Sequence, residues 1–182
     1  MKKFLFLLLA LLPIMASAQW AITPDGTLVD SITGDTHMII IEREGTAAEL
    51  YKQVLKNVHR LFASPDDVVS SIENEMITVN GYTETTLKYA GFNHPFEPLI
   101  SVKVEFKDGR MRVSAKWLST VWCKTTVTDP YTLLVKGGLK CFNKEGEIKN
   151  EKRYHIFNAI SSDFINRVIE VPTTDEATDD DW

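Results

Sequence analysis

Two alternating segments that flank Asp108-Gly109 constrain this chain more than any other feature. Apolar and polar side chains alternate over residues 100–107 and again over residues 110–117. Such alternation is typical of strands with one buried face, and Asp-Gly supplies the two positive-φ positions of a type I′ turn. We therefore predict a hairpin in one register, because a one-residue slip would place its whole apolar face in water. This turn pairs Lys107 with Arg110, Phe106 with Met111, Glu105 with Arg112, Val104 with Val113, Val102 with Ala115 and Ile100 with Trp117.

Two amphipathic segments are available to cover the apolar face of this hairpin. Thr46 and Glu49 match a capping box, and apolar residues recur at helical spacing over residues 47–62. A second helical pattern runs over residues 151–170. We predict a helix in each segment.

Shorter segments complete the predicted fold. Residues 37–42 include three successive isoleucines, which favour a strand covered on both faces. Strand-like runs at 68–73 and 76–83 join at Asn74, whereas residues 87–98 contain Gly91, Pro95 and Pro98 and are predicted to be a loop. The element order is strand, helix, four strands, helix. We predict an α+β fold in which an antiparallel sheet of about five strands carries both helices on one face.

The two ends of the chain differ from its middle. Residues 1–18 combine Lys2 and Lys3, an apolar run and Ala16-Ser17-Ala18, which together predict a cleavable signal peptide. Cleavage would leave a soluble mature chain without a membrane anchor, in the periplasm or outside the cell. We divide the rest into an N-terminal arm at 19–36, a single α+β domain at 37–172 and an acidic disordered tail at 173–182.

The charge balance argues against one class of partner. The formal charge of −5 becomes −7 once Lys2 and Lys3 are removed with the signal peptide. Nucleic-acid binding relies on Lys and Arg side chains that displace counterions. We therefore expect no nucleic-acid partner.

Cys123 and Cys141 are the two cysteines of the chain. An exported protein enters an oxidising compartment, so we predict a disulfide between them, worth about 3 kcal/mol. Two separate buried thiols are the alternative.

The pattern of elements resembles a known family. The residues that carry the resemblance are Ile39-Ile40-Ile41, Gly45, the Leu50-Tyr51 helix, Val68-Val69 and the hairpin from Phe106 to Arg112. They are similar to a family of exported Bacteroidetes proteins of unknown function, with a fold like one half of the TATA-binding protein. The resemblance covers roughly residues 37–122, and the segment between the two cysteines departs from it. It implies a fold and brings no activity or functional residues.

No catalytic constellation is visible, so we predict that the protein is not an enzyme and has no cofactor. The histidines, at positions 37, 59, 94 and 155, lack the close pairing typical of zinc sites. The serine pairs Ser70-Ser71 and Ser161-Ser162 lack the Gly-x-Ser-x-Gly elbow that exposes a nucleophile. A catalytic site scattered along the chain is the alternative.

The polar face of the hairpin is the first candidate site. Five basic residues oppose Glu105 there, which suits an anionic ligand or an acidic partner segment. A solvated face that resists strand pairing is the alternative. The five are Lys103, Lys107, Arg110, Arg112 and Lys116.

The segment at residues 124–140 is the second candidate site. Its short apolar run at residues 131–135 favours a further strand at the sheet edge. An apolar loop beside tryptophans, which could form a pocket rim or docking surface, is the alternative. The candidate rim residues are Trp117, Trp122, Tyr131, Leu133 and Leu134.

These observations favour an exported, non-enzymatic module that binds another envelope protein or helps an assembly. The alternative is a carrier or sensor for a small anionic ligand, held on the open sheet face or under the 124–140 segment.

Overall fold

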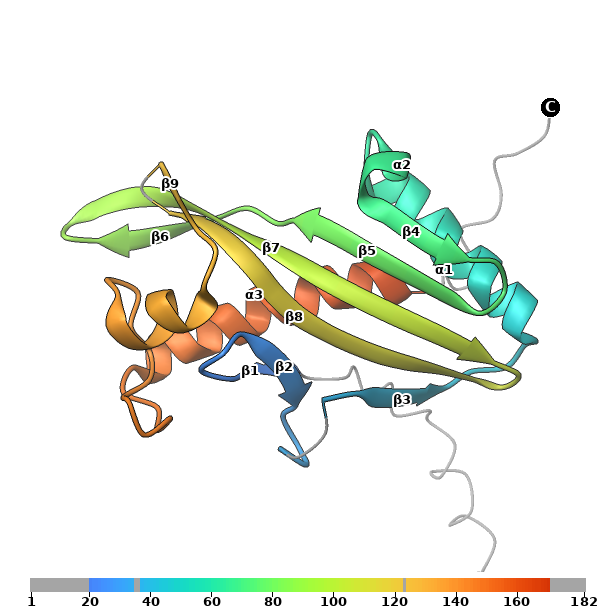
Figure 1. Cartoon of the computed structure of the whole chain (residues 1–182), viewed down its shortest axis with the longest axis horizontal. Coiled ribbons are helices and arrows are strands. Elements are labelled where there is room, and N and C mark those ends of the chain that lie inside the picture. The colour runs from blue at the N-terminus through green and yellow to red at the C-terminus, as the bar shows by residue number, and fades with distance from the viewer. Residues whose placement is uncertain (1–19, 35–36, 123, 171–182) are drawn as a thin grey trace, which may run out of the picture.

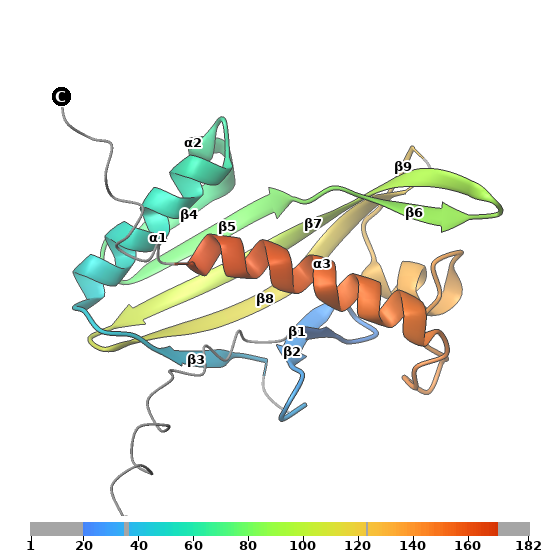
Figure 2. The same ribbon diagram turned by 180° about the vertical axis from the view of Figure 1, so that it is seen from behind.

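The computed structural model describes residues 20–34, 37–122 and 124–170, and within them nine strands form one antiparallel sheet. Helices α1 and α3 form a second layer on one face of this sheet (Figures 1 and 2). The strands are β1 (Trp20–Ile22), β2 (Thr27–Asp30), β3 (Ile39–Glu42), β4 (Val69–Ile72), β5 (Met76–Tyr82), β6 (Thr85–Tyr89), β7 (Phe92–Lys107), β8 (Arg110–Trp122) and β9 (Thr125–Val127). The helices are α1 (Ala47–Leu61), the short α2 (Pro65–Val68), the single π-helical turn η1 (Thr132–Lys136) and α3 (Glu151–Ile169).

The strands follow the order β1-β2-β8-β7-β5-β4, and β3 and β9 also pair with β8 while β6 pairs with β7. The predicted α+β class and the antiparallel sheet are confirmed. The predicted number of about five strands is wrong, because short segments that lack a strong local pattern extend the sheet at its edges and ends. The predicted signal peptide, Cys123 and the acidic tail lie outside the described residues.

The β7–β8 hairpin has the register expected from its sequence. Phe106 pairs with Met111, Val104 with Val113 and Ile100 with Trp117. The side chains of these six residues are buried. A bulge between Leu99 and Ile100 shifts the register beyond that point.

The turn of this hairpin is not the predicted type I′. Gly109 has a φ of +77°, but Asp108 is not among the residues with positive φ. The Asp108 carboxylate instead accepts a hydrogen bond from the Ala47 N–H at 2.8 Å. The Gly109 N–H donates to the Gly45 carbonyl at 2.9 Å. Contacts with the start of α1 therefore set the conformation of the turn. The turn still has two residues, so the predicted register of the hairpin is kept.

The predicted loop at residues 87–98 is wrong, since these residues belong to β6 and to the first part of β7. Ala90 and Gly91 connect the two strands with φ values of +49° and +87°, the backbone signs of a type I′ turn. Pro98 lies where β7 passes from pairing with β5 to pairing with β6. The Pro98 carbonyl accepts a hydrogen bond from the Thr83 N–H, which lies between β5 and β6, and prolines within sheets are confined to such interruptions and to edges.

Strand β3 and the N-terminal segment also differ from expectation. The three isoleucines of β3 alternate between partly buried and exposed, and Ile40 is 57% exposed. The prediction that residues 37–42 form a strand covered on both faces is therefore wrong. The segment we assigned to an arm contributes β1 and β2 to the sheet. The N–H groups of Trp20 and Ile22 donate to Ser162 and Asn158 of α3.

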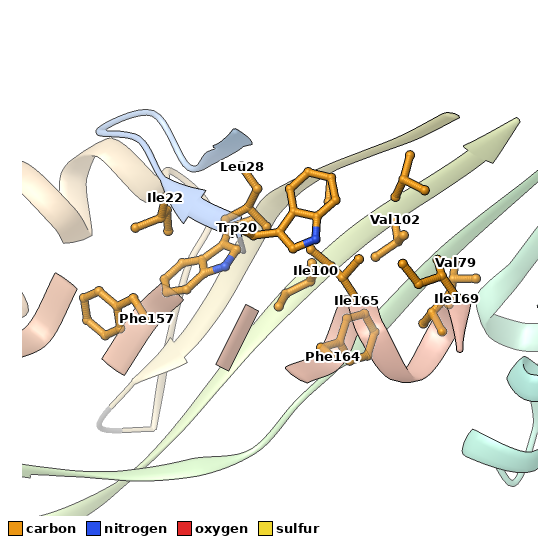
Figure 3. Close-up of a cluster of buried hydrophobic side chains, with 14 of the residues drawn as sticks. Trp20, Ile22, Leu28, Val79, Ile100, Val102, Phe157, Phe164, Ile165 and Ile169 are labelled. Carbon is orange, nitrogen blue, oxygen red and sulfur yellow. The ribbon is translucent and has the colours of Figure 1, made fainter. Parts of the chain in front are cut away.

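The core lies between the sheet and the two long helices. Helix α1 begins with the expected capping box, in which Thr46 and Glu49 bond each other's backbone. Buried side chains from β1, β2, β5 and β7 meet those of α3 in Figure 3. The Trp117 indole N–H donates to the Ser161 hydroxyl at 2.9 Å, which satisfies the polar atom of a buried side chain.

Residues 131–135 do not form the strand that we favoured. They enter the helical turn η1, in which Leu133, Leu134 and Val135 are buried. Asp129 starts this turn, because its carboxylate accepts from the Tyr131 N–H at 3.1 Å and from the Thr132 hydroxyl at 2.6 Å. Side-chain capping of free amides favours a helical start over an extended segment.

Candidate functional site

The sheet has one face that α1 and α3 do not cover, here called the open face (Figure 1). Cross-strand neighbours place Met76, Glu105, Arg112 and Ile40 in one row across β5, β7, β8 and β3. We call these four residues the central row. A second row crosses β5, β7 and β8 through Thr78, Lys103 and Ser114.

A bidentate ion pair occupies the middle of the central row. Arg112 donates from Nε and Nη2 to the two carboxylate oxygens of Glu105, at 2.9 and 2.6 Å. Lys103 Nζ lies 3.4 Å from the same carboxylate. The hydrogen bond from Arg112 lowers the pKa of Glu105, and the charge of Lys103 acts in the same direction against partial desolvation. Glu105 is therefore ionised at neutral pH, and its charge is matched by Arg112.

The five basic residues proposed from the sequence all belong to β7 and β8, but their charges are not equally available. Arg112 and Lys103 share Glu105. Lys107, Arg110 and Lys116 make no ion pair with any residue that the structure describes. We infer that these three carry the free positive charge of the open face.

Two carboxylates that the hairpin sequence could not reveal lie near this charge. Glu42 of β3 stands opposite Arg110, and Glu75 lines the same hollow as Arg110. Both arrive through strand pairing with residues distant in the chain. The positive excess of the open face is therefore smaller than the hairpin alone implies.

The open face is hollowed at two places. One hollow, of about 430 Å³, lies at the hairpin end between Ile40, Glu75, Lys107, Arg110 and the central ion pair. The other, of about 260 Å³, lies further along β7 and β8 and is lined by hydroxyl side chains and two lysines. The two hollows have no lining residue in common.

Two solved structures have a fold similar to that of this chain. A DUF4468 family protein from Bacteroides ovatus matches with a TM-score of 0.51 and 14% identity, covering 88% of this chain and 94% of that one. A TBP-like protein from Parabacteroides distasonis matches with a TM-score of 0.46 and 14% identity, covering 74% and 92%. The expected resemblance is confirmed at the level of the fold. No family model matches the chain, and no curated protein does.

At this level of identity the likeness extends to the fold and brings no site residues with it. The function of the chain therefore has to be inferred from its own side chains. The described parts contain no group of three or more His, Cys, Asp or Glu residues that could hold a metal ion. No helix among them is both long and apolar enough to cross a membrane.

The residues proposed as a pocket rim lie mostly in the core. Trp117, Trp122, Leu133 and Leu134 are buried members of the core cluster, and Tyr131 is partly buried against it. The ring centroids of Phe96 and Phe157 lie 5.7 and 5.3 Å from that of Trp117. These residues therefore pack in the core and do not form an open pocket rim.

Cys141 is buried and forms no disulfide with any residue that the structure describes. Burial raises the pKa of its thiol to about 12, so the thiol is protonated at neutral pH. A thiol in this state is a poor nucleophile. The predicted partner, Cys123, lies outside the described residues, and the disulfide stays a prediction.

Proposed function

We propose that this protein is an exported, non-enzymatic interaction module whose open face binds an extended acidic segment of another envelope protein. The observation that carries the proposal is the hollow at the hairpin end, where the free cations Lys107 and Arg110 lie beside the exposed side chain of Ile40. Charge and apolar surface in one hollow suit a peptide whose acidic and apolar residues alternate.

The electrostatic part of the proposal depends on Lys107 and Arg110. Both are exposed, and neither makes an ion pair with a described residue. Because Glu105 and Arg112 neutralise each other, an incoming carboxylate would meet the two free cations. Such complementarity raises the rate of encounter and selects the partner by charge.

The apolar part of the proposal depends on both ends of the central row. Ile40 is 57% exposed at one end, and Ile72, which pairs with Met76 beyond the other end, is 52% exposed. Covering apolar surface contributes roughly 25 cal/mol per Å². A segment lying along the row would bury both side chains and place its carboxylates beside the cations.

Two further features support the wider proposal. The pattern of residues 1–18 supports export, and a mature chain beginning at Gln19 is expected from N-terminal sequencing of the protein from its own cells. The protonated thiol of Cys141, a poor nucleophile, supports a non-enzymatic role.

Photo-crosslinking in the native cells tests the docking surface. A photoreactive phenylalanine analogue replaces Ile40 on the open face, and a matched control replaces Lys56, which is exposed on α1. We expect one discrete crosslinked product from position 40 and none of that mass from position 56. The double variant Lys107→Glu/Arg110→Glu should remove the product, whereas the matched reversal Lys52→Glu/Lys56→Glu on α1 should not. Equal crosslinking from both faces, or a product insensitive to the open-face reversal, would contradict the proposal.

A further inference from the structure

The second hollow of the open face is built from short hydroxyl side chains between long basic ones. Ser101 pairs with Lys116, and Lys103 pairs with Ser114. Thr78 of β5 pairs with Lys103 on its other side. This alternation of short and long side chains over three strands leaves a depression of about 260 Å³.

The hollow lies beside a break in the strand pairing of β8. Strand β8 pairs with β2 at Ala115 and Lys116, and with β3 only over Arg110–Val113. The hollow lies at this change of partner, with His37 at its border. No continuous edge strand among the described residues therefore borders it on that side.

Three hydroxyl groups in the hollow have no partner among the residues that the structure describes. Thr78, Ser101 and Ser114 are partly buried, and their side chains make no hydrogen bond to any described residue. Serines on the helical side differ, since Ser71 accepts from Tyr51 and Ser161 accepts from Trp117. The three hydroxyls of the hollow are thus available to donate to a ligand.

The charge around these hydroxyls is positive. The residues that line the hollow include Lys103 and Lys116 and no carboxylate. Lys116 makes no ion pair with a described residue. The Glu105 carboxylate, which lies near Lys103, already accepts hydrogen bonds from Nε and Nη2 of Arg112. Free hydroxyl donors between two ammonium groups form a site suited to a small anion.

We infer that this hollow binds a small oxyanion, a phosphate or carboxylate group, between Lys103 and Lys116 with Thr78, Ser101 and Ser114 as donors. The inference goes beyond the proposed docking function, because it needs no partner protein. It also uses neither Lys107 nor Arg110. Phosphate and carboxylate share the oxygen chemistry that these donors recognise, and the titrations distinguish them.

Titration followed by backbone amide NMR shifts tests the inference. Inorganic phosphate and acetate are added separately at constant ionic strength, with sodium chloride as the reference salt. We expect saturable shifts at Ser101, Ser114 and their neighbours with at least one of the two anions. A response to phosphate alone identifies a phosphate-binding site, and a response to acetate as well identifies a general carboxylate and phosphate site.

Matched variants separate the hollow from general surface charge. Lys116→Gln and the double variant Ser101→Ala/Ser114→Ala should each weaken binding on the order of tenfold, because each removes donors to a charged group. Lys107→Gln and Ser70→Ala, on the same face outside the hollow, should change the affinity by less than about twofold. Spectra of all variants without anion report whether the fold is intact.

Two results would overturn the inference. One is a response to phosphate and acetate no larger than the response to chloride. The other is equal weakening by the hollow variants and the controls. Either result leaves crosslinking from position 40 unaffected, so failure here and failure of the docking proposal are distinguishable.

Discussion

The two faces of the β7–β8 hairpin are made by alternate residues of the same strands, yet they are held in different ways. On the helical face, Trp117 is 2% exposed, packs on Phe96 and Phe157, and bonds Ser161. On the open face, the adjacent Lys116 is exposed and makes no ion pair with a described residue. The difference indicates that one face supplies the stability of the sheet while the other is free to change, and therefore free to bind.

Replacing Trp117 should break the covered face most severely. Trp117→Ala removes a buried ring and leaves the Ser161 hydroxyl without this donor, so we expect a loss of about 3–5 kcal/mol in the free energy of unfolding. Urea denaturation measures it. The neighbouring Lys116→Ala should change the stability by less than about 0.5 kcal/mol. Similar losses from both would mean that the two faces are not energetically distinct.

A smaller loss is expected at Gly81, where the helical layer touches the backbone of β5. A Cβ atom there would lie 2.6 Å from the Phe62 ring and 2.7 Å from the Phe164 ring. Gly81→Ala should therefore cost about 1–3 kcal/mol through overpacking. Asn80→Ala, one residue earlier and on the open side, is the matched control. Thermal melting compares the two, and an unchanged midpoint for Gly81→Ala would show that the rings have room to move.

A further prediction concerns the turn at Asp108-Gly109, which belongs to neither face of the hairpin. A side chain at Gly109 would meet nothing within 4 Å, so only its φ of +77° resists substitution. Gly109→Val should cost about 1–2 kcal/mol, because a β-branched residue disfavours positive φ. The control Lys107→Val introduces the same side chain at a residue without positive φ, so it should change the stability little. A melting temperature unchanged by Gly109→Val would mean that the turn adopts another conformation.

The smallest effect is expected from the ion pair on the open face. The lowered pKa of Glu105 means that its stabilising contribution is fully present above the ordinary glutamate value of 4.5 and is lost as the pH falls through the lower folded value. A double-mutant cycle of Glu105→Gln and Arg112→Met should give a coupling of about 0.2–1 kcal/mol at neutral pH, since the pair is partly exposed. The coupling should vanish in acid. A coupling above this range would make the open face structural.

Several predictions from the sequence succeeded because their physical cause is local. The capping residues of α1, the stripe of α3 and the alternation of β7 and β8 are each contained in one short segment. The five basic residues of the candidate face were found for the same reason. Glu42 and Glu75 were missed, because only strand pairing brings them to the hairpin.

The failed predictions share the opposite cause. Composition suggested a loop at 87–98 and a strand at 131–135, but pairing with β7 and capping by Asp129 decided otherwise. Three isoleucines suggested a strand covered on both faces, yet β3 lies where no layer covers Ile40.

The turn at Asp108-Gly109 shows where the limit of sequence-based prediction lies. Alternation and a two-residue loop determine the register of β7 and β8 by themselves, because side-chain direction has a period of two. The sequence did not determine the conformation of Asp108, since that depends on a hydrogen bond to Ala47, 61 positions away. The chain's own pattern thus decides which side chains share a face. Only the tertiary structure decides which segments cover the apolar face and what lies beside the polar one, because both come from distant parts of the chain.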